Sequence, residues 1–186
     1  MKNFALLALV CGLLIGTLHS ITRETISENR LAHATKKLRS VLNESQENIR
    51  ALDDNLYLVE SNGIPTGFIF AQTTTEGYNG IIKLWIAVDT NRTIRGVRVF
   101  QHQETPGIGD KIELSVSDWI RVFDGKSLEK NNWTLTRMGG DFDHFSGATI
   151  TSRALVRSVK SGLESAAEDI DTWLSLVKIE KEQNTE

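Results

Sequence analysis

The fold class of this 186-residue chain is decided by two stretches, Gly67-Phe-Ile-Phe-Ala-Gln-Thr73 and Gly80-Ile-Ile-Lys-Leu-Trp-Ile-Ala-Val88. Both are rich in β-branched and aromatic residues, which favour β-strands. The segment between them, Glu76-Gly77-Tyr78-Asn79, has the glycine and asparagine typical of a tight turn. Because strands joined by a tight turn pair antiparallel, the sequence predicts a β-hairpin here.

One further strand is predicted on each side of this hairpin. Leu56–Glu60 precedes it, and Asn62-Gly63-Ile64-Pro65 forms the intervening turn. Thr93–Phe100 follows it, beyond the turn residues Asp89-Thr90-Asn91-Arg92. The apolar residues of this last strand do not alternate strictly, which favours a β-bulge near Gly96. The whole pattern predicts an antiparallel meander.

Beyond the meander the apolar spacing becomes helical. Residues 111–123 are expected to form a short helix, and Trp133–Leu135 a short strand in an otherwise irregular region. Ala148–Val177 has the apolar spacing of a long amphipathic helix, in which Asp169–Asp171 would mark a break. Residues 179–186 form a polar tail. A sheet followed by flanking helices predicts an α+β fold.

Before the meander lies an apolar run. No charged side chain occurs from Asn3 to Thr22, which approaches the roughly 20 residues that span a bilayer as a helix. A cleaved signal peptide is disfavoured because Gly16-Thr17-Leu18-His19 is a poor cleavage site, and Cys11 sits too early for a lipoprotein. An uncleaved single span fits best, and Lys2 favours a cytoplasmic N-terminus.

The expected organisation therefore has four parts. Residues 1–22 are a transmembrane anchor, and residues 23–54 are a helical connector with an apolar stripe among its charges. Residues 55–178 form one extracytoplasmic domain, and residues 179–186 are the tail.

The composition excludes several classes of function. The formal net charge is −3 and no dense Lys/Arg tract occurs, so no nucleic-acid partner is expected. Cys11 is the only cysteine, which excludes an internal disulfide, a zinc ribbon and a cysteine-ligated cluster. The four histidines show no metal-binding spacing, so no metal site is predicted. Redox chemistry in this chain would require an organic cofactor.

The first candidate site is the run Asp143-His-Phe-Ser-Gly-Ala-Thr149, at the start of the long helix. Free N–H groups and the helix dipole favour a phosphate at such a position. Gly147 and Ala148 would let the backbone approach a ligand closely. An ordinary helix start, with Ser146 as its N-cap, is the alternative that these residues alone leave open.

The second candidate is His102-Gln-Glu104-Thr-Pro106-Gly107-Ile-Gly109, which directly follows a predicted strand. A Pro-Gly turn followed by another glycine exposes backbone N–H groups and lets the chain pass close to a flat ligand. His102 and Glu104 also suggest an acid/base pair. A hydrolase is disfavoured, because the sequence has no recognisable nucleophile–base pair.

With these two motifs behind one membrane span, the chain resembles the G subunit of the Rnf (or Rsx) electron-transport complex of bacterial inner membranes. A relative of that family is the C subunit of the sodium-pumping NADH:quinone reductase. The resemblance covers nearly the whole chain. The family's flavinylation pattern, Asp-x-x-Ser/Thr-Gly-Ala-Thr/Ser, is matched by Asp143, Ser146, Gly147, Ala148 and Thr149. The residues just before and inside this pattern are more similar to those of the Rnf subunit than to those of the sodium-pump subunit. They are Gly139-Gly140-Asp141-Phe142 and Phe145.

The resemblance implies that FMN is joined to Thr149 through a phosphoester bond, made by a separate flavin transferase from FAD. It implies that Asp143 is recognised by the transferase or shapes the turn. Arg153, one helical turn after Thr149, could then add a charge-assisted hydrogen bond to the phosphate, and a solvated residue on the helix face is the alternative. The other implied flavin-site residues are Ser146, Gly147, Ala148, Glu104, Thr105 and Gly107.

By the same resemblance, the domain faces the periplasm and the chain is a redox subunit of a translocase rather than a stand-alone enzyme. Its complex passes electrons between reduced ferredoxin and NAD, or towards another acceptor, coupled to cation movement. Its partners are the other membrane and redox subunits. Two alternatives stay open. One is the equivalent FMN subunit of a sodium-pumping NADH:quinone reductase, and the other is a flavin-free, membrane-anchored binding or assembly domain.

Overall fold

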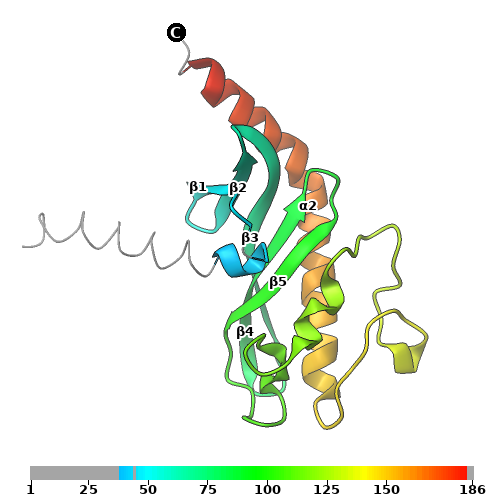
Figure 1. Cartoon of the computed structure of the whole chain (residues 1–186). Helices are drawn as coiled ribbons and strands as arrows, with labels where there is room; N and C mark the ends of the chain where they lie inside the picture. The colour runs from blue at the N-terminus through cyan, green and yellow to red at the C-terminus, as the bar shows by residue number, and fades with distance from the viewer. Residues whose placement is uncertain (1–37, 44, 184–186) are drawn as a thin grey trace, which may run out of the picture. The chain divides into compact units, whose positions relative to one another are not determined.

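The computed structural model describes residues 38–43 and 45–183, which belong to one compact unit built on a five-stranded antiparallel sheet. The strands follow one another across the sheet in chain order, as Figure 1 shows. They are β1 (Asn48–Asp53), β2 (Leu56–Ser61), β3 (Ile64–Gly77), β4 (Gly80–Asp89) and β5 (Ile94–Gln101). This sheet and the helix that covers it confirm the α+β class and the predicted meander.

The sheet differs from the prediction at its first edge. Residues 48–53, which the sequence predicts to be part of a helical connector, form strand β1 and pair antiparallel with β2. Helix is the wrong prediction there, because the Asp54-Asn55 turn allows the segment to fold back onto β2. The predicted bulge near Gly96 is confirmed. Ala87 pairs with Gly96 while Val88 pairs with Ile94, which leaves an extra residue in β5.

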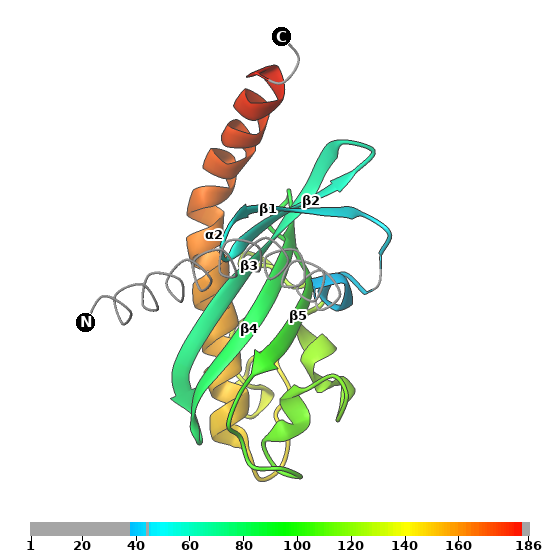
Figure 2. The same ribbon diagram turned by 90° about the vertical axis from the view of Figure 1, so that its left-hand side faces the viewer.

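One face of the sheet is covered by α2 (Thr149–Gln183), which runs along it in Figures 1 and 2. The apolar residues of the two layers form a continuous buried core. The layers come very close at Gly162, where an added Cβ would lie 2.9 Å from Ile86 Cδ1 and 3.2 Å from Phe70 Cε2. Among the fully buried core residues are Leu58, Phe68, Ile82, Leu84, Ile86, Leu155 and Val159.

Helix α2 is continuous, so the predicted break at Asp169–Asp171 is wrong. Ile170 is 1% exposed, and the Trp173 ring packs 5.2 Å from the ring of Phe68. Both aspartates are exposed, and Asp171 forms a 2.9 Å ion pair with Arg92, so neither interrupts the apolar stripe. The helix also extends to Gln183, into the predicted polar tail.

Between β5 and α2 the chain is largely irregular. It contains three short 3-10 segments, η1 (Asp110–Ile112), η2 (Asp118–Phe123) and η3 (Thr136–Met138). The single helix predicted over 111–123 is therefore wrong: Glu113 is extended, and Ser117 caps η2 by accepting a hydrogen bond from the Trp119 N–H. The strand predicted around Trp133–Leu135 is reduced to one bridge between Leu135 and Phe142.

Aromatic rings attach this irregular region to the core. Phe123 is fully buried and packs against Trp133, Phe142 and Trp119, with ring centroids 6.4, 5.3 and 5.7 Å apart. Trp119 lies 5.1 Å from the Phe145 ring and donates a 2.9 Å hydrogen bond from its indole N–H to the Asp143 carbonyl. These rings therefore hold the segment that leads into α2.

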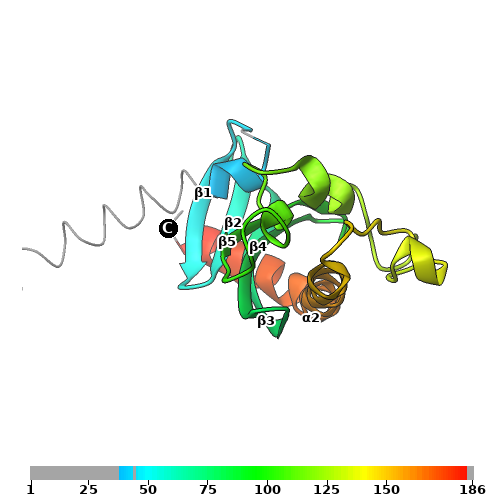
Figure 3. The same ribbon diagram turned by 90° about the horizontal axis from the view of Figure 1, so that it is seen from below.

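The other face of the sheet is covered in part by residues 38–43, seen opposite α2 in Figure 3. Leu38, Val41 and Leu42 are buried, and an added Cβ on Gly96 would lie 2.1 Å from the Val41 carbonyl oxygen. Arg98, itself 6% exposed, donates a 2.8 Å hydrogen bond to the Asn43 side chain. This part of the predicted connector is thus packed against the sheet.

The predicted anchor, residues 1–22, lies outside the described residues. Within 38–43 and 45–183, no helix combines the length and the apolar character needed to cross a membrane.

The stability of the domain is expected to fall below about pH 4.5 as the carboxyl group of Glu47 becomes protonated. Hydrogen bonds from Arg95 lower the pKa of Glu47 from 4.5 to about 2, and Thr66 and Ser45 also donate to it. Because the folded pKa is depressed, this stabilisation is complete above the unfolded pKa and is lost as the pH falls towards 2. At roughly 1.4 kcal/mol per pKa unit it amounts to on the order of 3 kcal/mol.

Urea unfolding of the full-length chain at pH 6, 4 and 2.5 measures this effect. Glu47→Gln should flatten the pH dependence of the unfolding free energy, whereas Glu129→Gln, at an exposed position, should follow the wild type. Parallel curves for Glu47→Gln and the wild type would contradict the assignment.

Candidate functional site

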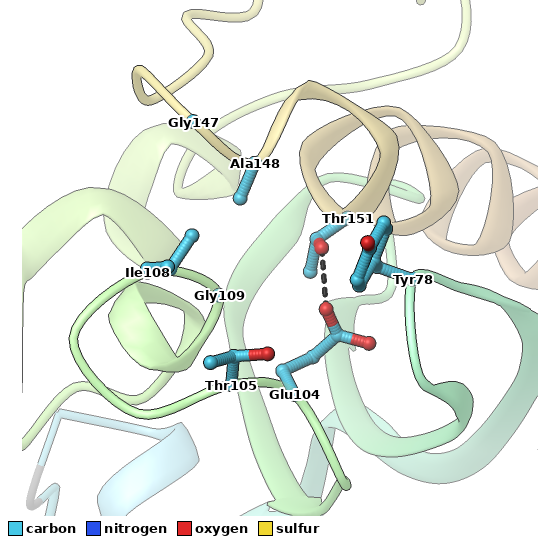
Figure 4. A pocket seen from close by; sticks show the side chains of 8 residues that line it. All are labelled: Tyr78, Glu104, Thr105, Ile108, Gly109, Gly147, Ala148 and Thr151. Atoms are coloured by element: carbon cyan, nitrogen blue, oxygen red, sulfur yellow. Dashed lines mark hydrogen bonds between the residues drawn. The ribbon is translucent and has the colours of Figure 1, made fainter.

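A pocket of about 250 Å³ opens where the β3–β4 turn, the loop after β5 and the start of α2 meet. Figure 4 shows its lining side chains converging from these three segments. The pocket is lined by Tyr78, Glu104, Thr105, Ile108, Gly109, Gly147, Ala148 and Thr151. The fold thus brings together the two motifs that the sequence singled out, although they lie far apart along the chain.

The loop after β5 forms one wall of the pocket. Thr105 to Ile108 make a tight turn in which the Thr105 carbonyl accepts hydrogen bonds from the N–H groups of Ile108 (3.1 Å) and Gly109 (2.9 Å). Gly107 has φ +76°, the left-handed conformation that the third residue of a type II turn requires. From the β3–β4 turn, the Asn79 side chain donates a 3.0 Å hydrogen bond to Thr105 Oγ1. The loop is therefore ordered by its own backbone and by the neighbouring hairpin.

Glu104 lies at the back of this pocket and is only 5% exposed. Its Oε1 accepts a 3.0 Å hydrogen bond from the Asn79 N–H, and its Oε2 accepts a 2.5 Å bond from the Thr151 hydroxyl. Both carboxylate oxygens are thus engaged by protein donors, one from the hairpin and one from α2. Of the lining residues within the described part of the chain, Glu104 and the Tyr78 phenol are the only ionisable groups.

His102 does not form an acid/base pair with Glu104 for a shared substrate. Its Nδ1 accepts a 3.0 Å hydrogen bond from the Glu104 N–H, so the ring proton is on Nε2. Nε2 lies 2.6 Å from Glu113 Oε1. Because both ring nitrogens are engaged, His102 orients the loop, and the geometry does not support the hydrolase alternative.

The start of α2 forms the opposite wall. Ser146 and Gly147 make a turn, and Gly147 has φ +90°, a conformation that favours glycine. The helix begins at Thr149, and the Ala148 carbonyl accepts a 3.1 Å hydrogen bond from the Ser152 N–H. Ala148 therefore occupies the N-cap position, so the interpretation of Ser146 as the N-cap is wrong. Alanine has no side-chain acceptor, which leaves the first helical N–H groups available to a ligand.

The hydroxyl groups of this first turn differ in their availability. Thr151 is 0% exposed and donates to Glu104. Ser152 is also 0% exposed, and its hydroxyl donates a 3.1 Å bond to the Ala148 carbonyl. Thr149 is partly exposed, and within the described part of the chain its hydroxyl has no hydrogen-bond partner. Of these three hydroxyls, only that of Thr149 is open to a reagent from outside.

The remaining predicted site residues lie around the pocket rather than in its lining. Asp143 and Ser146 are exposed in the segment before the helix, and Gly107 is at the tip of the loop. Arg153 is half-buried on α2, and its Nε is buried without a hydrogen-bond partner in the described structure. The predicted residues that do line the pocket in Figure 4 are Glu104, Thr105, Gly147 and Ala148.

Sequence reasoning missed Tyr78, Ile108 and the pocket role of Thr151. Tyr78 and Ile108 are 67% and 47% exposed, so they place apolar surface at the mouth of the pocket. A signal existed for both, since each is a large apolar residue within a turn otherwise made of polar and small residues. Among the described residues, no group of three or more His, Cys, Asp and Glu could hold a metal ion.

The chain is similar to the G subunit of the ion-translocating oxidoreductase complex of Photorhabdus laumondii, with 40% identity over 171 residues that cover 82% of this chain and 81% of that protein. The chain belongs to this G-subunit family. The corresponding G subunit of Vibrio vulnificus is 47% identical over 111 residues, which span 58% of this chain and about half, 53%, of that protein. The family resemblance predicted from the sequence is confirmed.

Within this member of the G-subunit family, residues 77–164 match the FMN-binding domain family. The matched range includes the β3–β4 turn, the loop after β5 and the start of α2. The crystal structure of the C subunit of the Na⁺-translocating NADH-quinone reductase from Parabacteroides distasonis is 25% identical, covers 60% of each chain and has a TM-score of 0.45.

Proposed function

We propose that this flavin-binding protein of an electron-transport complex holds its FMN covalently, through a phosphoester bond to Thr149. The observation that carries the proposal is the state of the three hydroxyls in the first turn of α2. Thr151 and Ser152 are buried and hydrogen-bonded, whereas Thr149 is partly exposed and has no hydrogen-bond partner in the described structure. Only Thr149 combines access for a modifying enzyme with a free oxygen atom.

The surroundings of Thr149 suit a phosphate diester. The first N–H groups of α2 lack a side-chain cap and the helix dipole is positive at this end, so both would stabilise the remaining negative charge. Arg153 follows one turn later, and its buried, unpartnered Nε is a donor that a phosphate oxygen could engage. No acidic residue lies in the first turn to oppose the phosphate.

The pocket suits the ring system of the flavin. Its volume of about 250 Å³ is below the roughly 300–1,000 Å³ of pockets that enclose a whole ligand, so part of the cofactor would remain outside. The Thr105 hydroxyl accepts from Asn79 and can still donate on one side, and Tyr78 and Ile108 offer apolar surface at the mouth. A bound flavin supplies electron transfer, while the protein holds it in place and adjusts its environment.

Attachment requires a separate flavin transferase with FAD as its substrate. The Thr149 oxygen forms the new bond to the FMN phosphorus, the pyrophosphate bond of FAD breaks, and AMP leaves while the threonine proton is released. Exposed Asp143 is available for recognition by this transferase, and the neighbouring Phe142 and Phe145 are buried and fix its position. We assign residues 1–22 to a single inner-membrane span and the domain to the periplasmic side, within a complex that moves ions as electrons pass.

Peptide mapping of the full-length chain, made in a host that has the transferase, tests this proposal. The expected result is a fluorescent band on a denaturing gel and a mass increase of one FMN minus one water on the peptide that contains Thr149. If neither the band nor the mass increase appears, the covalent carrier is wrong and a flavin-free binding or assembly domain becomes the better description.

A further inference from the structure

We propose that Glu104 and Thr151 form a brace that fixes the flavin-binding loop against the first turn of α2, and that the Glu104 charge lowers the reduction potential of the flavin held there. This role rests on the function proposed above. It makes Glu104 a positioning residue, because each of its carboxylate oxygens accepts a hydrogen bond from the protein, one from Asn79 and one from Thr151, and it acts on the flavin through the loop and through its charge.

The brace joins three segments that are distant in the sequence. Glu104 is in the loop after β5, Asn79 is in the β3–β4 turn, and Thr151 is in α2. Glu104 and Thr151 are 5% and 0% exposed, so water does not compete for the 2.5 Å hydrogen bond between them. Removing either partner would leave a buried polar group unpaired, which destabilises the contact between the two segments. The two walls of the pocket are therefore held together at this point.

Two glycines make room for the carboxylate. A Cβ added to Gly77 would lie 2.7 Å from Glu104 Oε1, and a Cβ added to Gly109 would lie 2.8 Å from Oε2. Gly109 has φ −92° and ψ −17°, which any residue can adopt, so its backbone conformation does not require glycine. The second glycine of the Pro-Gly-x-Gly sequence is thus explained by the space that Glu104 needs.

The charge of Glu104 gives the brace an electrostatic effect. Among the described residues that line the pocket, Glu104 is the only carboxylate and none is Lys or Arg. A flavin becomes more negative as it accepts electrons, and a nearby buried negative charge disfavours that change. The carboxylate is therefore expected to hold the midpoint potential below the value it would have beside a neutral side chain.

Four variants and one control variant separate the geometry from the charge. In Glu104→Gln, the amide oxygen still accepts from Asn79 and the amide N–H can donate to Thr151, so the brace persists without its charge. In Thr151→Val, the shape and the charge persist but the hydrogen bond is lost. Thr151→Ser restores the hydroxyl. Gly109→Ala pushes on Glu104 while both partners remain, with Gly107→Ala as the control for a purely conformational effect.

Hydrogen exchange of the flavin-free full-length chain gives the first readout, and it does not depend on flavinylation. Thr151→Val and Gly109→Ala should accelerate amide exchange at Ile108 and Gly109, while Thr151→Ser and Glu104→Gln should exchange like the wild type. Unchanged exchange in Thr151→Val would overturn the brace, and Glu104→Gln still tests the charge if Thr151→Val does not fold.

Redox titration of the flavin-loaded chain gives the second readout. Glu104→Gln should raise the midpoint potential, whereas Thr151→Val should mainly change the visible circular dichroism of the flavin, and Thr151→Ser should restore it. An unchanged potential in Glu104→Gln would overturn the electrostatic role. If the wild type carries no FMN mass increase, the proposed function fails instead, and the exchange result still stands for the brace.

Discussion

Replacing Thr149 with alanine is expected to abolish covalent flavin attachment completely. The phosphoester requires a hydroxyl that the transferase can reach, and the other hydroxyls of the first turn are not accessible. Thr151 and Ser152 are both 0% exposed and donate to Glu104 and to the Ala148 carbonyl. In-gel flavin fluorescence and the intact mass of the full-length Thr149→Ala chain, coexpressed with the transferase, should therefore both match the unmodified protein.

Matched variants make this result specific. Thr149→Ser keeps a hydroxyl at the same position and should still accept FMN, since the motif admits either residue. Ser146→Ala removes an exposed hydroxyl three residues earlier, outside the helix, and should keep the fluorescent band. A band that persists in Thr149→Ala would contradict the assignment, and peptide mapping would then show whether Thr151 or Ser152 opens to the transferase.

The central fold could be predicted from the sequence because each strand and turn is specified by residues that are close together in the chain. The strands of the meander are separated by turn residues, and strands joined by short turns pair with their neighbours. The same holds for α2, whose apolar stripe follows helical spacing over most of its length. Strand β1, residues 48–53, could not be predicted in this way. Its six residues have no strong alternation, and it becomes a strand only because β2 offers a partner edge.

The candidate site could be predicted only in part, because its residues come from segments that are far apart in the sequence. The two motifs were visible as glycine-containing segments beside a strand and a helix. Their meeting depends on how the β5 loop packs against α2, which no local pattern specifies. The hydrogen bond between Glu104 and Thr151 crosses 47 positions of the chain, and Tyr78 enters the pocket from a third segment. Burial, which depends on the fold, is what separates Thr151 from Thr149 as a hydroxyl that a transferase could reach.

The second large effect is expected from Phe123→Ala, which should destabilise the domain by about 3–5 kcal/mol, the usual cost of removing a large buried ring. Phe123 is 0% exposed and packs against Trp119, Trp133 and Phe142. The shortened side chain would leave a cavity that these rings cannot fill, since their own positions are fixed by further contacts. Urea unfolding of the full-length chain, followed by tryptophan fluorescence, measures the loss directly.

The destabilisation is also expected to affect the flavin site, because Phe123 packs against a residue that positions the acceptor motif, Asp143–Thr149. Trp119 holds the Asp143 carbonyl and packs on Phe145, and Trp119 in turn rests on Phe123. Flavinylation of Phe123→Ala should therefore fall at temperatures where the domain is still folded. Val116→Ala is the matched control, since Val116 lies in the same region but is 49% exposed, and a change there should stay within about 0.5 kcal/mol. If Phe123→Ala lost stability while flavinylation stayed complete, the ring cluster would be a local core element without influence on the motif. An equal loss of stability in Val116→Ala would show that the whole segment, rather than the buried ring, is sensitive to truncation.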